Sequence, residues 1–202
     1  MQTTRIIGAI FITAIAAGVF TAVLVHAVWF APETEVTDTS ISVPTSTVVA
    51  VQSGDKPARL IIPSIGVNAN VQDVGIAASG NMAVPNNFTD VAWYKYGPVP
   101  GALGSAVMDG HVDNGLSLAG VFKHLSDVKV GDDVYVENQS GQRLHFKVTD
   151  IELYPYKSVP TDQIFNPKDT ERLNLITCDG SWVQGQRTYD HRLVVYTTLM
   201  SS

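Results

Sequence analysis

The stretch DDVYVENQSGQRLHFKVTD, residues 132–150, carries the pattern that decides the fold class. On both sides of QSGQ (residues 139–142), apolar and polar side chains alternate with a period of two, as they do along a strand with one buried face. Ser and Gly between the two halves favour a reversal of the chain. The stretch therefore predicts a β-hairpin.

Similar runs, rich in Val, Ile, Leu, Thr and Tyr, occur before and after this hairpin. Gly, Pro, Asn or Asp stands in most of the gaps between them. Short helical turns are expected only at residues 120–128 and 161–171. Seven or eight short strands without long helices predict a mostly β domain, either a closed barrel or a sandwich. The further runs are residues 59–65, 67–74, 104–112, 172–178 and 191–199.

The N-terminal segment is strongly apolar. Residues 6–30 contain no Asp, Glu, Lys or Arg, and about 20 apolar residues in a helix suffice to cross a bilayer. We expect one transmembrane helix, with residues 1–5 in the cytoplasm because Arg5 precedes the span. A cleaved signal peptide is the alternative, with VHA (residues 25–27) as a cleavage site, although its apolar region is usually only ~7–15 residues long.

The segment after this span differs in composition. Residues 31–57 are rich in Thr, Ser and Pro and are expected to form a linker, because they cannot bury enough apolar surface to fold alone. Residues 58–202 are long enough for one domain with a substantial core. The chain has 13 basic and 19 acidic residues, a net charge of −6, which gives no basic surface for nucleic acid. The prediction is a membrane-anchored extracellular domain.

The chain contains one cysteine, Cys178, which follows the strand-like run LNLIT and precedes Asp179 and Gly180. In an oxidising compartment an unpaired cysteine forms an intermolecular disulfide or remains a reactive thiol. A buried structural cysteine is the alternative. Alternation along the run places Cys178 on the same side as Ile176, and we expect the thiol to reach the rim of the barrel.

A thiol nucleophile needs a base or a cationic neighbour. Of the histidines in the domain, His111 is the best candidate because it follows Gly110 at the end of a strand-like run. Arg192 lies near the start of the last predicted strand. If residues 172–178 and 191–199 pair antiparallel, with a 12-residue loop between them, the guanidinium lies near Cys178 and could stabilise an oxyanion.

These residues carry a resemblance. GSAVMDGHVDN (104–114), LNLITCDG (173–180) and RLVVY (192–196) are similar, in this order, to the His, Cys and Arg signatures of sortases, which are membrane-anchored cysteine transpeptidases of Gram-positive surfaces. RLIIPSIGVNANV (59–71) and the segment 91–113 look most like the class F branch. The resemblance covers about residues 58–199 and implies a closed sortase-type β-barrel.

The resemblance also implies a mechanism. Cys178 attacks the carbonyl after Thr in a Leu-Pro-x-Thr-Gly-like signal, His111 acts as general acid and then base, and Arg192 binds the substrate backbone and the oxyanion. Thr177 and Asp179, on either side of the thiol, are assigned to substrate and oxyanion support. The implied partners are surface proteins that bear the signal and an amine of a peptidoglycan precursor or pilin, or water. No cofactor and no metal are expected.

Two carboxylates depart from the expected surroundings of His111. Asp109, after Met108, stands where a small apolar residue is expected, and it either raises the pKa of the imidazole or faces solvent. Asp113 either orients His111 or is a solvated turn residue.

Three other functions compete with this interpretation. An L,D-transpeptidase would carry a His just before its Cys, which LITC lacks. A zinc hydrolase could use His111, Asp113 and Cys178 as ligands, although their spacing is weak support. A non-enzymatic adhesin barrel could stack sugars on Trp93, Tyr94 and Tyr96.

Overall fold

The computed structural model describes residues 15, 17–23, 25–26, 56–114 and 116–200. Within residues 56–200 the strands are β1 Pro57–Ile62, β2 Val67–Val74, β3 Val91–Tyr94, β4 Gly104–Asp109, β5 Asp133–Asn138, β6 Arg143–Pro155, β7 Glu171–Val183 and β8 Thr188–Leu199. The helical segments are short: η1 Pro63–Ile65, η2 Leu125–Asp127, η3 Tyr156–Ser158 and α2 Thr161–Phe165.

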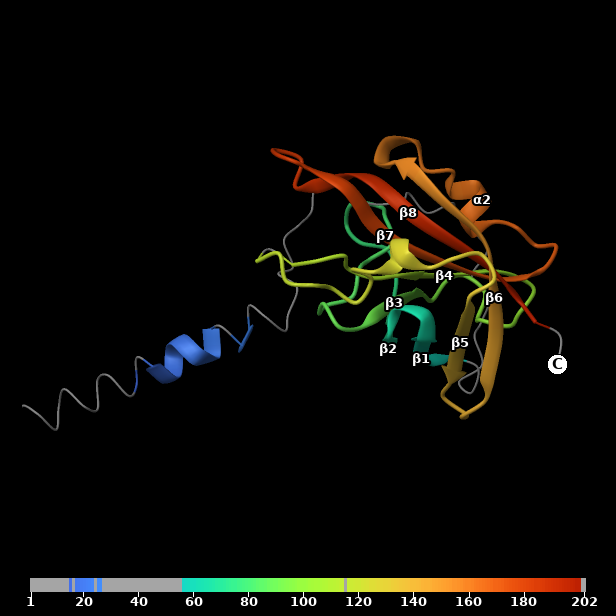
Figure 1. Cartoon of the computed structure of the whole chain (residues 1–202), viewed down its shortest axis with the longest axis horizontal. Helices are drawn as coiled ribbons and strands as arrows, with labels where there is room; N and C mark the ends of the chain where they lie inside the picture. Colours follow the sequence, from blue (N-terminus) through green and yellow to red (C-terminus); the bar gives the residue numbers. More distant parts are fainter. Residues whose placement is uncertain (1–14, 16, 24, 27–55, 115, 201–202) are drawn as a thin grey trace, which may run out of the picture.

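The strands form a closed barrel in the order β1-β2-β3-β4-β7-β8-β6-β5, with β5 pairing back to β1 (Figure 1). The pairs β2–β3 and β4–β7 are parallel, and the others are antiparallel. The predicted mostly β barrel is thus confirmed. The predicted hairpin is β5–β6, in which Val134 pairs with Phe146 and Val136 with Leu144.

Side-chain alternation divides the core into two clusters. Along β7, Leu173 and Leu175 belong to the cluster inside the barrel. Ile176 belongs to a second cluster on the outer side, which Ile164 and Phe165 of α2 join. Both sides of the sheet are covered at residues 104–108 of β4, 173–177 of β7 and 192–195 of β8, and these runs are therefore buried without alternation. They form a rigid base for the residues at their ends.

Strand β3 was not predicted. Its four residues, VAWY, are all buried and show no alternation, and β3 runs parallel to β2 after a long connection. Trp93 is fully buried and its indole Nε1 donates to the carbonyl of Pro98 at 3.2 Å, while Tyr94 is only 4% exposed. The sugar-stacking surface considered for an adhesin is therefore wrong for Trp93 and Tyr94.

The β7–β8 hairpin is longer than predicted and reaches beyond the barrel in Figure 1 (red). The antiparallel pairing is confirmed, but the expected 12-residue loop is wrong, because pairing resumes at Trp182↔Tyr189 after a bulge. Gly180, with φ of 86°, allows this bulge instead of a turn. Cys178 and Arg192 therefore lie within the two strands and not at their ends.

The N-terminal residues that the structure describes (15, 17–23, 25 and 26) are helical. No helix among the described residues is long and apolar enough to span a membrane. Most of the predicted span (6–30), residues 1–5 and most of the predicted linker (31–57) lie outside the described residues.

Candidate active site

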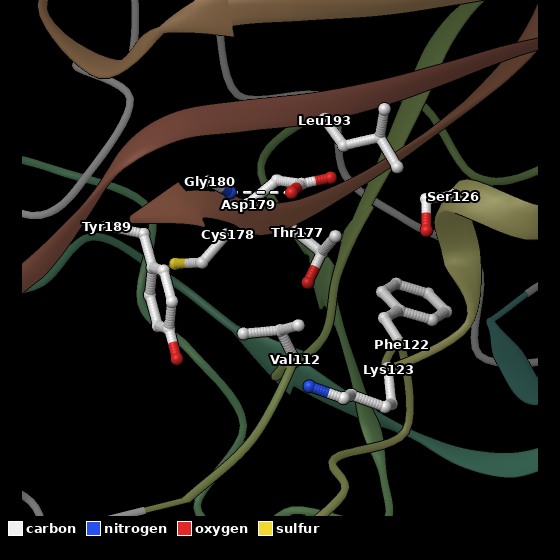
Figure 2. Close-up of a pocket in the computed structure, with 10 residues that line it drawn as sticks. All are labelled: Val112, Phe122, Lys123, Ser126, Thr177, Cys178, Asp179, Gly180, Tyr189 and Leu193. Atoms are coloured by element: carbon white, nitrogen blue, oxygen red, sulfur yellow. Dashed lines mark hydrogen bonds between the residues drawn. The ribbon is translucent and has the colours of Figure 1, made fainter. Parts of the chain in front are cut away.

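Cys178 on β7 lies directly opposite Arg192 on β8. The thiol is half-buried, and the charge of Arg192 acts on it. Cys178 also lines a pocket of about 200 Å³ at the end of the barrel (Figure 2). In this view the Cys178 side chain points toward the ring of Tyr189. The other lining residues are Val112, Phe122, Lys123, Ser126, Thr177, Asp179, Gly180 and Leu193.

His111 reaches this end of the barrel through the parallel pairing of β4 with β7. The register ends at Asp109↔Ile176, and the amide of Gly110 continues it by donating to the carbonyl of Ile176 at 3.2 Å. The hydroxyl of Thr177 then donates to the carbonyl of Gly110 at 2.8 Å. Continuation of the register two residues beyond Asp109↔Ile176 brings His111 level with Cys178 along the strands.

Gly110 is required by close packing. A Cβ atom at this position would lie 2.6 Å from Cδ2 of Phe122 and 2.7 Å from Cγ1 of Val121. Phe122 is buried in the barrel core and Val121 packs against that core, so a side chain at position 110 would have to displace core atoms.

The imidazole of His111 is held by residues of the connection between β2 and β3. Its Nε2 donates to the carbonyl of Pro85 at 3.1 Å, and its ring lies 5.1 Å from that of Phe88. The Pro85 bond fixes the proton on Nε2, so Nδ1 is the nitrogen that can accept a proton from another group. Among the described residues, no hydrogen bond or ion pair joins the ring to Cys178.

Arg192 is only 4% exposed, which excludes a solvated surface charge. Its Nη1 donates to the carbonyls of Tyr189 at 3.1 Å and His191 at 2.8 Å, and its Nη2 donates to the Thr188 hydroxyl at 2.8 Å. A guanidinium has five N–H groups. Within the described residues, Nε–H and one N–H of Nη2 take no part in these bonds.

Charge and burial act in opposite directions at the thiol. Burial raises the pKa of Cys178 to about 11, the positive charge of Arg192 opposes this rise, and Asp109, Asp113 and Asp179 add to it. Burial lowers the pKa of His111, opposed by the Pro85 bond and by Asp113. The resting pair is therefore a neutral thiol and a neutral imidazole at pH 7.

Asp109, at the end of β4, is half-buried. Burial raises its pKa to about 7, while the charge of Arg192 and a bond from the Gly110 amide lower it. The charge of Asp109 acts on Arg192 and Cys178. The carboxylate whose charge acts on His111 is Asp113, and the effect of Asp109 on the imidazole that the sequence suggested is not found among the described residues.

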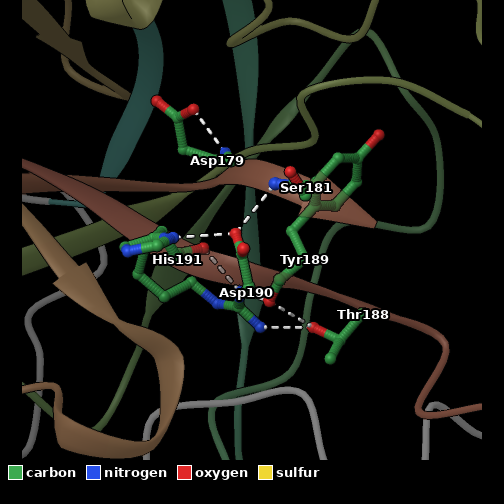
Figure 3. Close-up of polar contacts among 8 residues, drawn as sticks. Asp179, Ser181, Thr188, Tyr189, Asp190 and His191 are labelled. Carbon is green, nitrogen blue, oxygen red and sulfur yellow. Dashed lines mark hydrogen bonds and ion pairs between the residues drawn. The ribbon is translucent and has the colours of Figure 1, made fainter. Parts of the chain in front are cut away.

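Asp113 and Asp179 are both engaged by neighbouring groups. Asp113 accepts a 2.5 Å bond from the hydroxyl of Tyr189, so it is not a solvated turn residue. Asp179 accepts a bond from the amide of Gly180, and its carboxylate is thus directed at the backbone of the bulge (Figure 3). The hydroxyl of Thr177 likewise contacts Gly110 and fixes the backbone before His111.

The remaining histidines of the barrel each pair with an aspartate. His124 contacts Asp127 and His145 contacts Asp133. His191 contacts Asp190 at 2.7 Å, and Asp190 also accepts from the Ser181 amide (Figure 3). In the part of the chain that the structure describes, no three His, Cys, Asp or Glu side chains are grouped as metal ligands.

Sequence reasoning did not single out Tyr189. This residue lines the Cys178 pocket, binds Asp113 through its hydroxyl and binds Arg192 through its carbonyl. No local signal identifies it, because its partner Asp113 is 76 positions away in the chain.

A family model of the sortase domain matches residues 60–200, which is more than half of the chain. The chain therefore belongs to the sortase family, a family of cysteine transpeptidases. No curated protein matches the sequence at a significant level.

Solved sortases have the same fold. Sortase A from Corynebacterium diphtheriae matches with a TM-score of 0.57 and 21% identity over 73% of this chain, but over only 61% of its own length. Sortase C-1 from Actinomyces oris gives 0.56 and 26% over 71% of this chain and 73% of that one. The sortase D5 transpeptidase of Clostridium perfringens gives 0.55 and 18% over 75% and 83%.

Proposed function

We propose that this sortase is a transpeptidase with Cys178 as nucleophile, His111 as general acid and base, and Arg192 as the cation that stabilises the oxyanion. The observation that carries the proposal is the direct pairing of Cys178 with the buried Arg192. A buried guanidinium beside a lone thiol favours negative charge at that place. The register of β4 on β7 supports the role of His111.

The first half-reaction forms a thioester. Proton transfer from Cys178 to Nδ1 of His111 produces the thiolate, which attacks the carbonyl carbon after Thr in a Leu-Pro-x-Thr-Gly-like signal. The two available N–H groups of Arg192 bind the developing oxyanion or the substrate backbone. The Thr–Gly bond breaks as His111 returns the proton to the departing amine.

The second half-reaction transfers the acyl group. An acceptor amine attacks the thioester, His111 takes its proton, and the Cys178 thiolate leaves and is reprotonated. The proposed acceptor is an amine of a peptidoglycan precursor or a pilin. Water in the same position gives hydrolysis. No cofactor is required by this sequence of steps.

The subclass and the location also belong to the proposal. The motifs quoted above support class F, and the apolar residues 6–30 support a single-pass anchor with the catalytic domain outside the cell. Fractionation of cells that express the full chain, followed by protease treatment of intact cells, tests this arrangement. A protein found only in the soluble cytoplasmic fraction would contradict it.

The function is tested with a library of Leu-Pro-x-Thr-Gly-like peptides, incubated with and without amines that resemble peptidoglycan stems and analysed by mass spectrometry. Wild-type protein should cleave after Thr and form a mass adduct with the amine. Cys178→Ala should fold normally and form neither product. Retained turnover by folded Cys178→Ala would reject the nucleophile, and His111→Ala compared with His124→Ala tests the base in the same assay.

A further inference from the structure

Tyr189 on β8 connects three parts of the candidate site. Its hydroxyl donates to Oδ2 of Asp113 at 2.5 Å. Its ring lines the pocket of Cys178, where Figure 2 shows the two side chains next to each other. Its carbonyl accepts from Nη1 of Arg192 at 3.1 Å. One residue thus contacts the segment after His111 and the guanidinium, beside the thiol.

Asp113 belongs to a segment that is tied to His111 by backbone bonds. Residue 113 forms a β-bridge with Ala119. The amide of Gly120 donates to the carbonyl of Val112 at 2.9 Å, and that of Phe122 donates to the carbonyl of His111 at 2.9 Å. A displacement at Asp113 is therefore transmitted to His111, two residues earlier.

The other end of this connection is also fixed. The ring of Trp182 on β7 packs against that of Tyr189, edge to face, at 5.4 Å and 78°. Among the described residues, the Tyr189–Asp113 bond is the one side-chain hydrogen bond between residues 111–119 and the β7–β8 hairpin. Without it, the outer part of the His111 segment is not held against the strands that carry Cys178 and Arg192.

We propose that Tyr189 and Asp113 form a positioning bridge, which holds the His111 segment beside Cys178 during acyl transfer. The inference rests on the proposed transpeptidase function. Neither side chain needs to exchange a proton with the substrate. Burial and the bond to Asp113 raise the pKa of Tyr189 far above neutrality, so the phenol keeps its proton and remains a donor.

Three variants separate the bond from the ring and from the charge. Tyr189→Phe keeps the ring and removes the hydroxyl, Asp113→Ala removes the acceptor, and Asp113→Asn keeps an acceptor oxygen without the charge. Steady-state kinetics should show kcat lowered about 10- to 100-fold in the first two with KM for the peptide nearly unchanged, because small misplacement of a catalytic group slows chemistry without weakening binding. Asp113→Asn should recover most of the turnover.

The double variant should be no slower than the slower single one, because both remove the same bond. Tyr135→Phe and Asp127→Ala are matched controls outside the site and should retain wild-type kcat. Tyr189→Phe at wild-type kcat would overturn the bridge. A loss in Asp113→Asn as large as in Asp113→Ala would assign the effect to the charge and overturn it as well.

Hydrogen exchange gives a readout that does not depend on the reaction. The amides of Gly120 and Phe122 should exchange faster in Tyr189→Phe than in wild type, while amides of β5 and β6 keep their rates. If wild-type protein processes no sorting peptide, the proposed function fails, and this measurement still decides the bridge. Unchanged exchange at both amides would then reject it.

Discussion

Arg192 is a charged residue that is buried and hydrogen-bonded to its neighbours. The guanidinium binds two carbonyls of its own strand and the Thr188 hydroxyl, and Arg192 lies opposite Cys178 in the register of β7 and β8. A lysine carries one compact ammonium and cannot make these bonds and also bind an oxyanion. The residue therefore requires the geometry of arginine and not only its charge.

We expect Arg192→Lys to lower turnover of a sorting peptide by at least about 100-fold, the loss typical for one oxyanion donor. The thermal midpoint should also fall, because buried carbonyls lose their donors. Kinetics and thermal unfolding of Arg192→Lys and of the exposed Arg187→Lys measure both effects. Near-normal kinetics for Arg192→Lys would contradict the role of the guanidinium and would mean that backbone amides stabilise the oxyanion.

Asp109 offers a test of the electrostatics around the thiol. Because this carboxylate adds to the high pKa of Cys178, its neutralisation in Asp109→Asn should lower the thiol pKa below about 11 and increase the thiolate fraction at a given alkaline pH. The rate of iodoacetamide alkylation as a function of pH reports this midpoint. Asp127→Asn is the control. A midpoint that stays constant or rises in Asp109→Asn would contradict the assignment.

At the scale of elements, the end of β4 determines where His111 lies. Gly110 has no room for a side chain against Phe122 and Val121, and Thr177 holds its carbonyl from β7. Gly110→Ala should destabilise the fold by about 1–3 kcal/mol, the usual cost of overpacking, and should lower turnover because His111 is displaced. Denaturant unfolding and peptide kinetics measure the two effects.

The control is Gly141→Asn in the β5–β6 turn, where no atom lies within 4 Å of the added Cβ. Asparagine tolerates the positive φ of this position. Both stability and turnover of the control should stay close to wild type. An equally active Gly110→Ala variant would show that the end of β4 adapts and does not fix His111.

The elements differ in how well the sequence predicts them, for physical reasons. The β5–β6 hairpin is predicted because buried residues alternate with more exposed ones along both strands, and the sequence shows the same alternation of apolar and polar residues. Strand β3 leaves no alternation because all four residues are buried. The hairpin β7–β8 is underestimated because Asp179 and Gly180 resemble a turn, whereas the pairing continues beyond a bulge.

The residues of the candidate site also differ in how well the sequence predicts their contacts. Cys178 and Arg192 could be paired from the sequence because they lie on consecutive strands of one hairpin. His111 was chosen from its motif and from Gly110, and its catalytic role stays a prediction. Tyr189 and the surroundings of Asp109 could not be found, because they depend on contacts between strands distant in sequence and on burial, which a single sequence does not record.

At the scale of the whole molecule, the barrel depends on its first strand for closure. β1 pairs with β2 on one side and with β5 on the other, and its Leu60 and Ile62 are fully buried. Burial of each such side chain contributes about 1.5–3 kcal/mol. Loss of β1 also leaves two unpaired strand edges, which favour aggregation.

A pair of truncations tests whether the barrel is the complete folding and catalytic unit. The fragment 56–202 keeps β1 and should unfold cooperatively at the thermal midpoint of the barrel in the full chain. It should also transfer to a soluble amine at the same rate, because residues 56–200 contain all the barrel strands that the structure describes and the candidate site. The fragment 63–202 differs only by β1 and should show no cooperative transition and no turnover. Circular dichroism melting and mass-spectrometric transfer assays on both fragments, with the full chain in detergent as reference, decide the point. If the fragment 63–202 unfolds cooperatively and is active, β2 and β5 can close the barrel without β1. If the fragment 56–202 folds but transfers no acyl group, residues before Lys56 contribute to the site.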